Sequence, residues 1–163
     1  DGSFQTEITL KKGANPVTIE VEDWAGNRIE KKVQLLYQHG ILLTIGSKIM
    51  VNGDRQIQMD LAPMLKDGRT FIPIRYLGEA MGIVFETKTN AKKDVVIVTL
   101  SWNTHKIVIN LQTKETTMDG KKVVMDAFPF ILKGRLMVPL RFVSEQMGKA
   151  VIWDSVDQTI LVM

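Results

Sequence analysis

An internal repeat constrains the fold of this chain more than any other feature of its sequence. Residues 60–85 (DLAPMLKDGRTFIPIRYLGEAMGIVF) align without gaps with residues 126–151 (DAFPFILKGRLMVPLRFVSEQMGKAV). Self-similarity of this kind indicates one structural unit present twice, packed on its own copy. Neither copy, at about fifty residues, buries enough surface to be stable alone. We therefore expect residues 41–163 to form one pseudo-symmetric domain, with repeats at about 46–100 and 113–163.

Each copy predicts a hairpin followed by a short helix. Asn52-Gly53 and Asp119-Gly120 stand between alternating residues, and such pairs close tight hairpins because both turn positions need positive φ. Proline fits the first helical position and glycine a left-handed cap. We expect helices over 73–81 and 139–147, ended by Gly82 and Gly148, with further strands after each. These elements predict an α+β fold, an antiparallel sheet with two short helices built from the two repeats.

Residues 1–38 predict strands of a β-sandwich that precede this domain. Apolar and polar residues alternate near Phe4–Leu10, Val17–Val21 and Ile29–Tyr37, and period two places one face on a core. The segment Asp23-Trp24-Ala25-Gly26-Asn27 predicts a turn; a calcium loop is the weaker interpretation, because calcium needs six or more oxygen ligands. With its Gly-Ser-Phe opening, the segment resembles the closing strands of bacterial immunoglobulin-like (Ig-like) domains. We expect a fragment of a longer polypeptide, with a linker near residues 38–40.

The repeated motifs also resemble a known family. Val-Asn-Gly, Asp-x-x-Pro, Gly-Arg-Thr-x-[Val/Ile]-Pro-[Leu/Ile]-Arg, Glu-x-[Leu/Met]-Gly and Val-x-Trp-Asp, found between about Ile41 and Met163, are similar to the copper amine oxidase N-terminal domain, or stalk domain. Thr87 departs from the pattern where the second copy has Trp153. The resemblance implies a sheet wrapped against helices in exported, cell-wall or surface-layer proteins of Gram-positive bacteria. In copper amine oxidases the copper and the quinone belong to another, catalytic domain, whose motifs have no match here.

Composition excludes several classes of site and partner. The 163 residues include no cysteine, so thiolate metal sites, disulfides and cysteine nucleophiles are excluded. A net charge of +3 with mixed signs is not a nucleic-acid-binding pattern. Apolar runs are too short for membrane insertion. We expect no cofactor, no nucleic-acid partner and no membrane segment.

Metal and catalytic sites are the weaker interpretations of the remaining polar residues. His39 and His105 are the two histidines, whereas a copper or zinc site needs at least three ligands, so we interpret them as surface residues. Asp60 with Glu79, or Asp126 with Glu145, could serve as acid and base. A structural role is favoured, because each Glu follows an Arg by four residues on one helix face and each Asp can accept backbone N–H bonds at a strand end.

The remaining candidates are arginine and tryptophan side chains. The motif arginines could bind an anionic polymer such as teichoic acid, but capping carbonyls and pairing with Asp or Glu inside the domain are favoured. Trp153 is expected in the core, and Trp102, at a hairpin bend, is expected to be exposed and is the candidate ligand contact. The motif residues that we expect to be structural are Asp60, Pro63, Gly68, Arg69, Pro73, Arg75, Glu79, Gly82, Asp126, Pro129, Gly134, Arg135, Pro139, Arg141, Glu145, Gly148 and Trp153.

The sequence thus predicts a non-catalytic structural and attachment module of an exported cell-surface protein. Its expected partners are neighbouring domains of the same polypeptide. A carbohydrate- or cell-wall-polymer-binding domain is the alternative, and an amine oxidase is excluded by the missing catalytic motifs.

Overall fold

The computed structural model describes residues 6, 8, 13–37 and 40–163. The chain divides into two compact units, residues 1–39 and 40–163, which we describe separately. None of the helices in the described residues is long and apolar enough to cross a membrane.

The described part of the first unit is a long antiparallel hairpin. Strands β1 (Gly13–Glu22) and β2 (Arg28–Tyr37) pair along their full length. Their turn is held by Asp23, whose Oδ1 accepts hydrogen bonds from the amides of Ala25 and Asn27 at 2.8 and 2.9 Å. The expected strand near Phe4–Leu10 falls largely outside the described residues, and the Ig-like sandwich stays a prediction.

The second unit contains three antiparallel sheets and two short helices. The first sheet has the order β12-β11-β10-β9-β8 and comprises β8 (Val84–Thr89), β9 (Val95–Trp102), β10 (His105–Asn110), β11 (Glu115–Met118) and β12 (Lys121–Val123). The second has the order β15-β16-β3-β4-β5 and comprises β3 (Ile41–Thr44), β4 (Ile49–Asn52), β5 (Arg55–Gln58), β15 (Val151–Asp154) and β16 (Thr159–Val162). The third has the order β13-β14-β7-β6 and comprises β6 (Met64–Lys66), β7 (Arg69–Pro73), β13 (Phe130–Leu132) and β14 (Arg135–Pro139).

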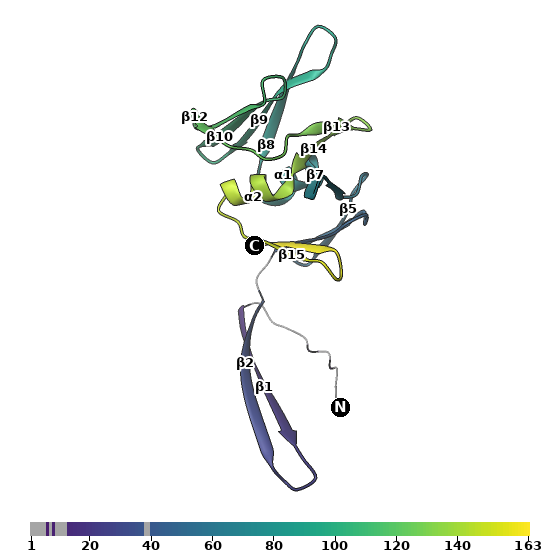
Figure 1. Ribbon diagram of the computed structural model, residues 1–163, viewed down its shortest axis with the longest axis vertical. Helices are drawn as coiled ribbons and strands as arrows, with labels where there is room; N and C mark the ends of the chain where they lie inside the picture. The colour runs from purple at the N-terminus through teal and green to yellow at the C-terminus, as the bar shows by residue number, and fades with distance from the viewer. Residues whose placement is uncertain (1–5, 7, 9–12, 38–39) are drawn as a thin grey trace. The chain divides into compact units, whose positions relative to one another are not determined.

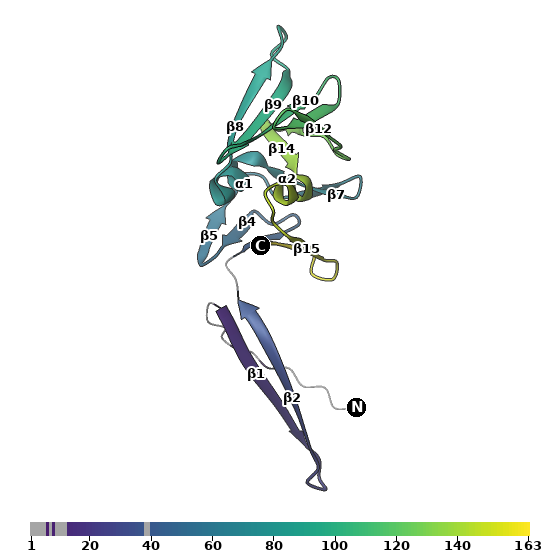
Figure 2. The same cartoon turned by 90° about the vertical axis from the view of Figure 1, so that its left-hand side faces the viewer.

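The four-stranded sheet and the helices α1 (Ile74–Met81) and α2 (Leu140–Gln146) lie between the two five-stranded sheets (Figures 1 and 2). One hydrophobic core joins these layers, with contributions from both helices and all three sheets. At its centre, Ile72 of β7 pairs with Val138 of β14, and both side chains are fully buried.

The expected α+β fold class is wrong, because the described residues are mostly β. They form sixteen strands and two helices, and the helices have only eight and seven residues. The strands are short, several of three or four residues, and tight turns join many of them. Such strands are too brief for a period-two pattern to reveal them, so the sequence understates the β content.

The two copies exchange their last two strands. Strand β9 of the first copy pairs with β10 of the second, with Leu100 opposite Ile107. Strand β16 of the second copy pairs with β3 of the first, with Ile160 opposite Leu43. Each structural copy therefore contains seven strands and a helix, β3 to β9 or β10 to β16, and is longer than the repeat seen in the sequence.

Both helices form at the expected places, with differences at their ends. Pro73 and Pro139 are the last residues of β7 and β14 and the N-caps of the helices, rather than their first residues. Gly82 caps α1 in the left-handed conformation, with φ +72°. Helix α2 ends at Gln146, and Gly148 has the expected positive φ of +71°.

Candidate functional site

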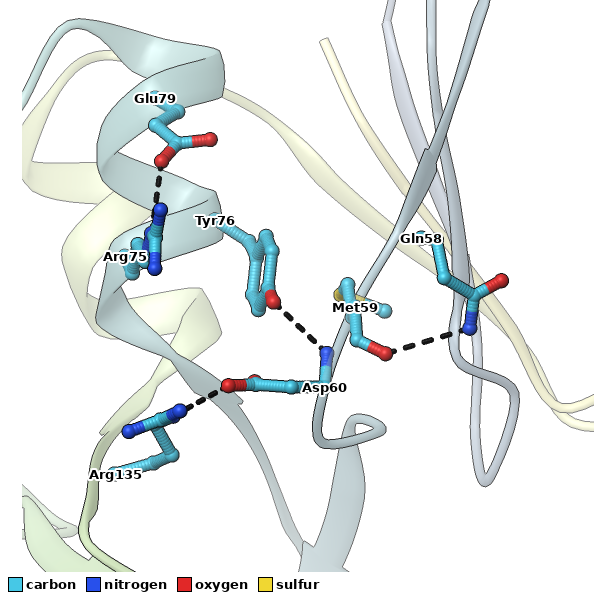
Figure 3. Close-up of polar contacts among 7 residues, drawn as sticks. All are labelled: Gln58, Met59, Asp60, Arg75, Tyr76, Glu79 and Arg135. Atoms are coloured by element: carbon cyan, nitrogen blue, oxygen red, sulfur yellow. Dashed lines mark hydrogen bonds and ion pairs between the residues drawn. The ribbon is translucent and has the colours of Figure 1, made fainter.

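Two ion pairs cross between the copies beside the central sheet. The Nε of Arg135 lies 2.5 Å from the Oδ2 of Asp60 (Figure 3), and the Nε of Arg69 lies 2.6 Å from the Oδ2 of Asp126. Arg135 is the repeat equivalent of Arg69, and Asp126 that of Asp60. Each copy therefore supplies the arginine that pairs with the other copy's aspartate. The sequence predicted arginine–carboxylate pairing within the domain but not this reciprocity.

Asp60 is held by both its backbone and its side chain. Its amide donates a hydrogen bond of 2.8 Å to the hydroxyl oxygen of Tyr76 on α1 (Figure 3). The guanidinium of Arg135, and secondarily the Tyr76 hydroxyl, lower the pKa of the Asp60 carboxyl. The main partner of the Asp60 carboxylate is thus an arginine of the other copy. In the second copy, Phe142 replaces Tyr76 and has no hydroxyl for an equivalent bond.

Each helix carries one arginine–glutamate pair. The Nε of Arg75 lies 3.0 Å from the Oε1 of Glu79 (Figure 3), and the corresponding distance from Arg141 to Glu145 is 4.0 Å. The hydrogen bond to Glu79 raises the pKa of Arg75. These carboxylates therefore face guanidinium groups, and the geometry favours ion pairing over a pair of acid and base.

The motif prolines and glycines determine the local conformation of the backbone. Pro63 and Pro129 are buried, and the carbonyl of Pro63 accepts a hydrogen bond from the amide of Gly46 at 2.9 Å. Gly68 and Gly134 close the β6–β7 and β13–β14 hairpins with φ of +71° and +74°. Residues other than glycine adopt this left-handed conformation at a cost.

A cavity with a volume of about 660 Å³ lies beside α2. We call it the α2 cleft. Its lining combines aromatic side chains with both kinds of ion pair, and includes Arg69, Asp126, Arg141, Phe142, Glu145 and Trp153. Trp153 is half-buried, so that it packs against the core while it also lines the cleft. This cavity falls in the size range typical of small-ligand sites.

A smaller cavity occupies the equivalent place beside α1. It has a volume of about 280 Å³ and is lined by Arg75, Thr87 and Arg135, the repeat equivalents of Arg141, Trp153 and Arg69. We call it the α1 cleft. The two clefts differ at this position, where the first copy departs from the motif. The α1 cleft is lined instead by one aromatic side chain, Phe85, which stands where the α2 cleft has Val151, and its lining includes no carboxylate.

The expected exposure of Trp102 is wrong. Only 7% of this residue is exposed, and it belongs to the hydrophobic core. Its ring centroid lies 5.7 Å from that of His105, so the hairpin bend folds the indole inward. Trp102 is therefore too buried to contact a ligand. Trp24 is instead fully exposed, at the tip of the β1–β2 hairpin.

His105, the histidine among the described residues, is paired with a carboxylate. His105 is engaged with Asp119, at 2.7 Å from Nδ1 to Oδ2, and this contact lowers the pKa of Asp119. His39 lies outside the described residues. Within those residues, no three or more His, Cys, Asp or Glu side chains gather in a group that could hold a metal ion.

Comparison with known proteins identifies the family. The sequence model of the copper amine oxidase N-terminal domain matches residues 23–97 and 50–162. No curated protein and no solved structure matches the chain significantly.

Proposed function

Because the chain belongs to the copper amine oxidase N-terminal domain family, we propose that it is a non-catalytic accessory module that supports and attaches other parts of a larger exported protein. The observation that carries this proposal is the reciprocal pairing of Arg69 with Asp126 and of Arg135 with Asp60. These four motif residues link the copies to each other, which is a structural task.

The geometry of the remaining motif residues agrees with that role. Arg75 pairs with Glu79, Gly82 caps a helix, and Gly68 and Gly134 close hairpins. A catalytic carboxylate with a raised pKa would suit acid–base chemistry. The environment of Asp60 does the opposite, because the neighbouring guanidinium lowers its pKa.

A structural module of two interlocked copies should unfold as one cooperative body. Trp102 reports on the sheet of β8 to β12 and Trp153 on the sheet of β3 to β5 with β15 and β16, so the indole NMR signals of both can be followed during urea titration. We expect the two signals to be lost at the same urea concentration. Separate midpoints would contradict the interlocked module.

Catalysis and location are tested separately. The chain is loaded with copper and assayed for hydrogen peroxide release from benzylamine and tyramine, with a complete copper amine oxidase as the positive control. We expect no release, and sustained copper-dependent release would contradict the proposal.

Fractionation of cells that produce the parent protein should place it in the cell-wall or extracellular fraction. Recovery in the cytoplasmic fraction would contradict the exported location.

A further inference from the structure

We propose that the α2 cleft binds a neutral pyranose oligosaccharide, with Trp153 as the surface on which one sugar ring stacks. This inference rests on the proposed accessory role, because it specifies how such a module could attach its parent protein to a glycan. The proposed ligand contact is Trp153 in the α2 cleft, instead of Trp102, which is buried.

The first argument is the position of Trp153. It lies in β15 opposite Ile160, packs against the core, and lines the α2 cleft. Its attachment to a paired strand and to the core fixes the ring before a ligand arrives, which reduces the entropy lost on binding. The face of an indole carries partial negative charge. The C–H groups on one face of a pyranose carry partial positive charge, so they are attracted to the indole face. Phe142 adds a second aromatic side chain to the same lining.

The second argument is the balance of charge in the cleft. Two guanidinium groups and two carboxylates line it, and they are arranged as Arg69 with Asp126 and Arg141 with Glu145. The positive charges are thus compensated locally, and a phosphate-rich polymer would meet two carboxylates. A ligand with many hydroxyl groups suits this lining better, because hydroxyls donate to carboxylates and accept from guanidinium groups. The polar side chains are also exposed by about half, with 51% for Arg69 and 58% for Arg141, so a ligand can reach them.

The third argument is that the repeat provides its own comparison. The α1 cleft has the equivalent arginines but Thr87 in place of Trp153, and its volume is about 280 Å³ instead of about 660 Å³. Tyr76 is also bonded to the Asp60 backbone on that side, whereas Phe142 cannot make this bond. The α1 cleft has one aromatic side chain, Phe85, but it lacks the two carboxylates of the α2 cleft and is less than half its volume. These differences favour the α2 cleft as the position suited to a ligand. We therefore expect one binding site per chain, in the α2 cleft.

The test uses the whole chain and follows the Trp indole N–H signals by NMR. Cellotetraose and the tetramer of β-1,4-linked N-acetylglucosamine are the probes, and inorganic polyphosphate represents the anionic polymers. We expect at least one of the two sugars to shift the Trp153 signal in a saturable way and to leave Trp24 and Trp102 unchanged. Trp153→Thr, which installs the residue of the first copy, should weaken binding by about tenfold or more, equivalent to about 1.4 kcal/mol.

Matched variants separate loss of binding from loss of folding. Arg141→Gln changes an exposed helix residue, so the fold should persist while sugar affinity falls several-fold. Arg75→Gln, the equivalent change in the α1 cleft, should leave affinity unchanged. The proposal is overturned if neither sugar shifts Trp153, if polyphosphate shifts it instead, or if Arg141→Gln and Arg75→Gln weaken binding equally. None of these outcomes touches the accessory role itself, which the unfolding and peroxide experiments test.

Discussion

At the scale of single residues, the reciprocal arginine–aspartate pairs specify how the copies dock rather than supplying most of the stability. About half of each arginine side chain is exposed, 48% for Arg135 and 51% for Arg69, and ion pairs at such positions contribute little because water screens them. The buried Ile72–Val138 pair contributes more through apolar contact. The ion pairs oppose alternative dockings, since a shifted register would leave like charges together or charges unpaired.

Charge reversal tests this role. Arg135→Asp places two carboxylates side by side, so we expect the melting temperature to fall by several degrees. Adding Asp60→Arg restores an ion pair of reversed polarity and should recover most of the loss, as measured by circular dichroism. Arg75→Asp is the control, because it reverses the charge of an arginine whose ion pair lies within one helix rather than across the copies. If the double variant is no more stable than Arg135→Asp alone, the pair does not act across the copies.

The lowered pKa of Asp60 gives a pH dependence of defined sign. Because the folded-state pKa lies below the unfolded-state value of about 3.9, the ionised carboxylate stabilises the fold above that pH, and the contribution is lost as pH falls through the folded-state pKa. Asp60→Asn should therefore be less stable than the parent at pH 7, with the difference shrinking below about pH 4. Thermal melts from pH 7 to about pH 2.5 measure it. A difference that grows on acidification would contradict the assignment.

At the scale of elements, two glycines of α1 have different roles, Gly82 at the end of the helix and Gly78 in its interior. Gly82 has φ +72° and no heavy atom within 4 Å of the position that a Cβ would occupy, so only its backbone conformation demands glycine. Gly78, inside α1, is different, because a Cβ there would lie 2.7 Å from the carbonyl oxygen of Ile83. The amide of Ile83 also donates to the Gly78 carbonyl at 3.0 Å. The chain folds back against the helix at this point.

Gly78→Ala should therefore reverse the usual effect of alanine in a helix. In an open helix the change stabilises by up to about 1 kcal/mol, but here the contact with Ile83 should make it destabilising by about 1–3 kcal/mol. Ser144→Ala is the control, since Ser144 occupies the equivalent position in α2 and already carries a Cβ. Urea unfolding of both variants measures the difference. A Gly78→Ala protein more stable than the parent would contradict the close approach.

The sequence predicts local features well and their assembly poorly. Pro139 and Gly148 mark a helix because the preset φ of proline and the left-handed φ of glycine act within a few residues. The turn that we expect at Asn52-Gly53 lies one residue later in the structure. The two-residue loop is Gly53-Asp54, and only Gly53 of these two has positive φ. Burial of Trp102 depends on which strand folds over it, and the Arg135–Asp60 contact joins residues 75 positions apart. No local pattern carries that information.

At the scale of the whole domain, the exchange of strands makes the two copies mutually dependent. Strands β8 and β9 complete the sheet of the second copy, and β15 and β16 complete that of the first. Each copy alone would leave an uncovered edge in all three sheets, because β9 pairs with β10, β16 with β3 and β14 with β7, and it would supply only part of the core. The two copies therefore resemble the subunits of a dimer within one chain, rather than two independently folded repeats in tandem.

Cutting the chain between the copies tests this dependence. A specific protease site inserted between Asn103 and Thr104, in the tight β9–β10 turn, would divide the domain after folding. We expect the two fragments to stay associated in size-exclusion chromatography, and each purified fragment to show an unfolded NMR spectrum until the other is added. Fragments that separate and remain folded would contradict the exchange.

The pairing of Ile41 with Val162 places the entry and the exit of the 40–163 unit side by side on adjacent strands. Tension applied between these two ends would separate β3 from β16 one hydrogen bond at a time, because the two strands are antiparallel and are pulled from the same end. The unit is therefore poorly suited to bear a load applied between its two ends.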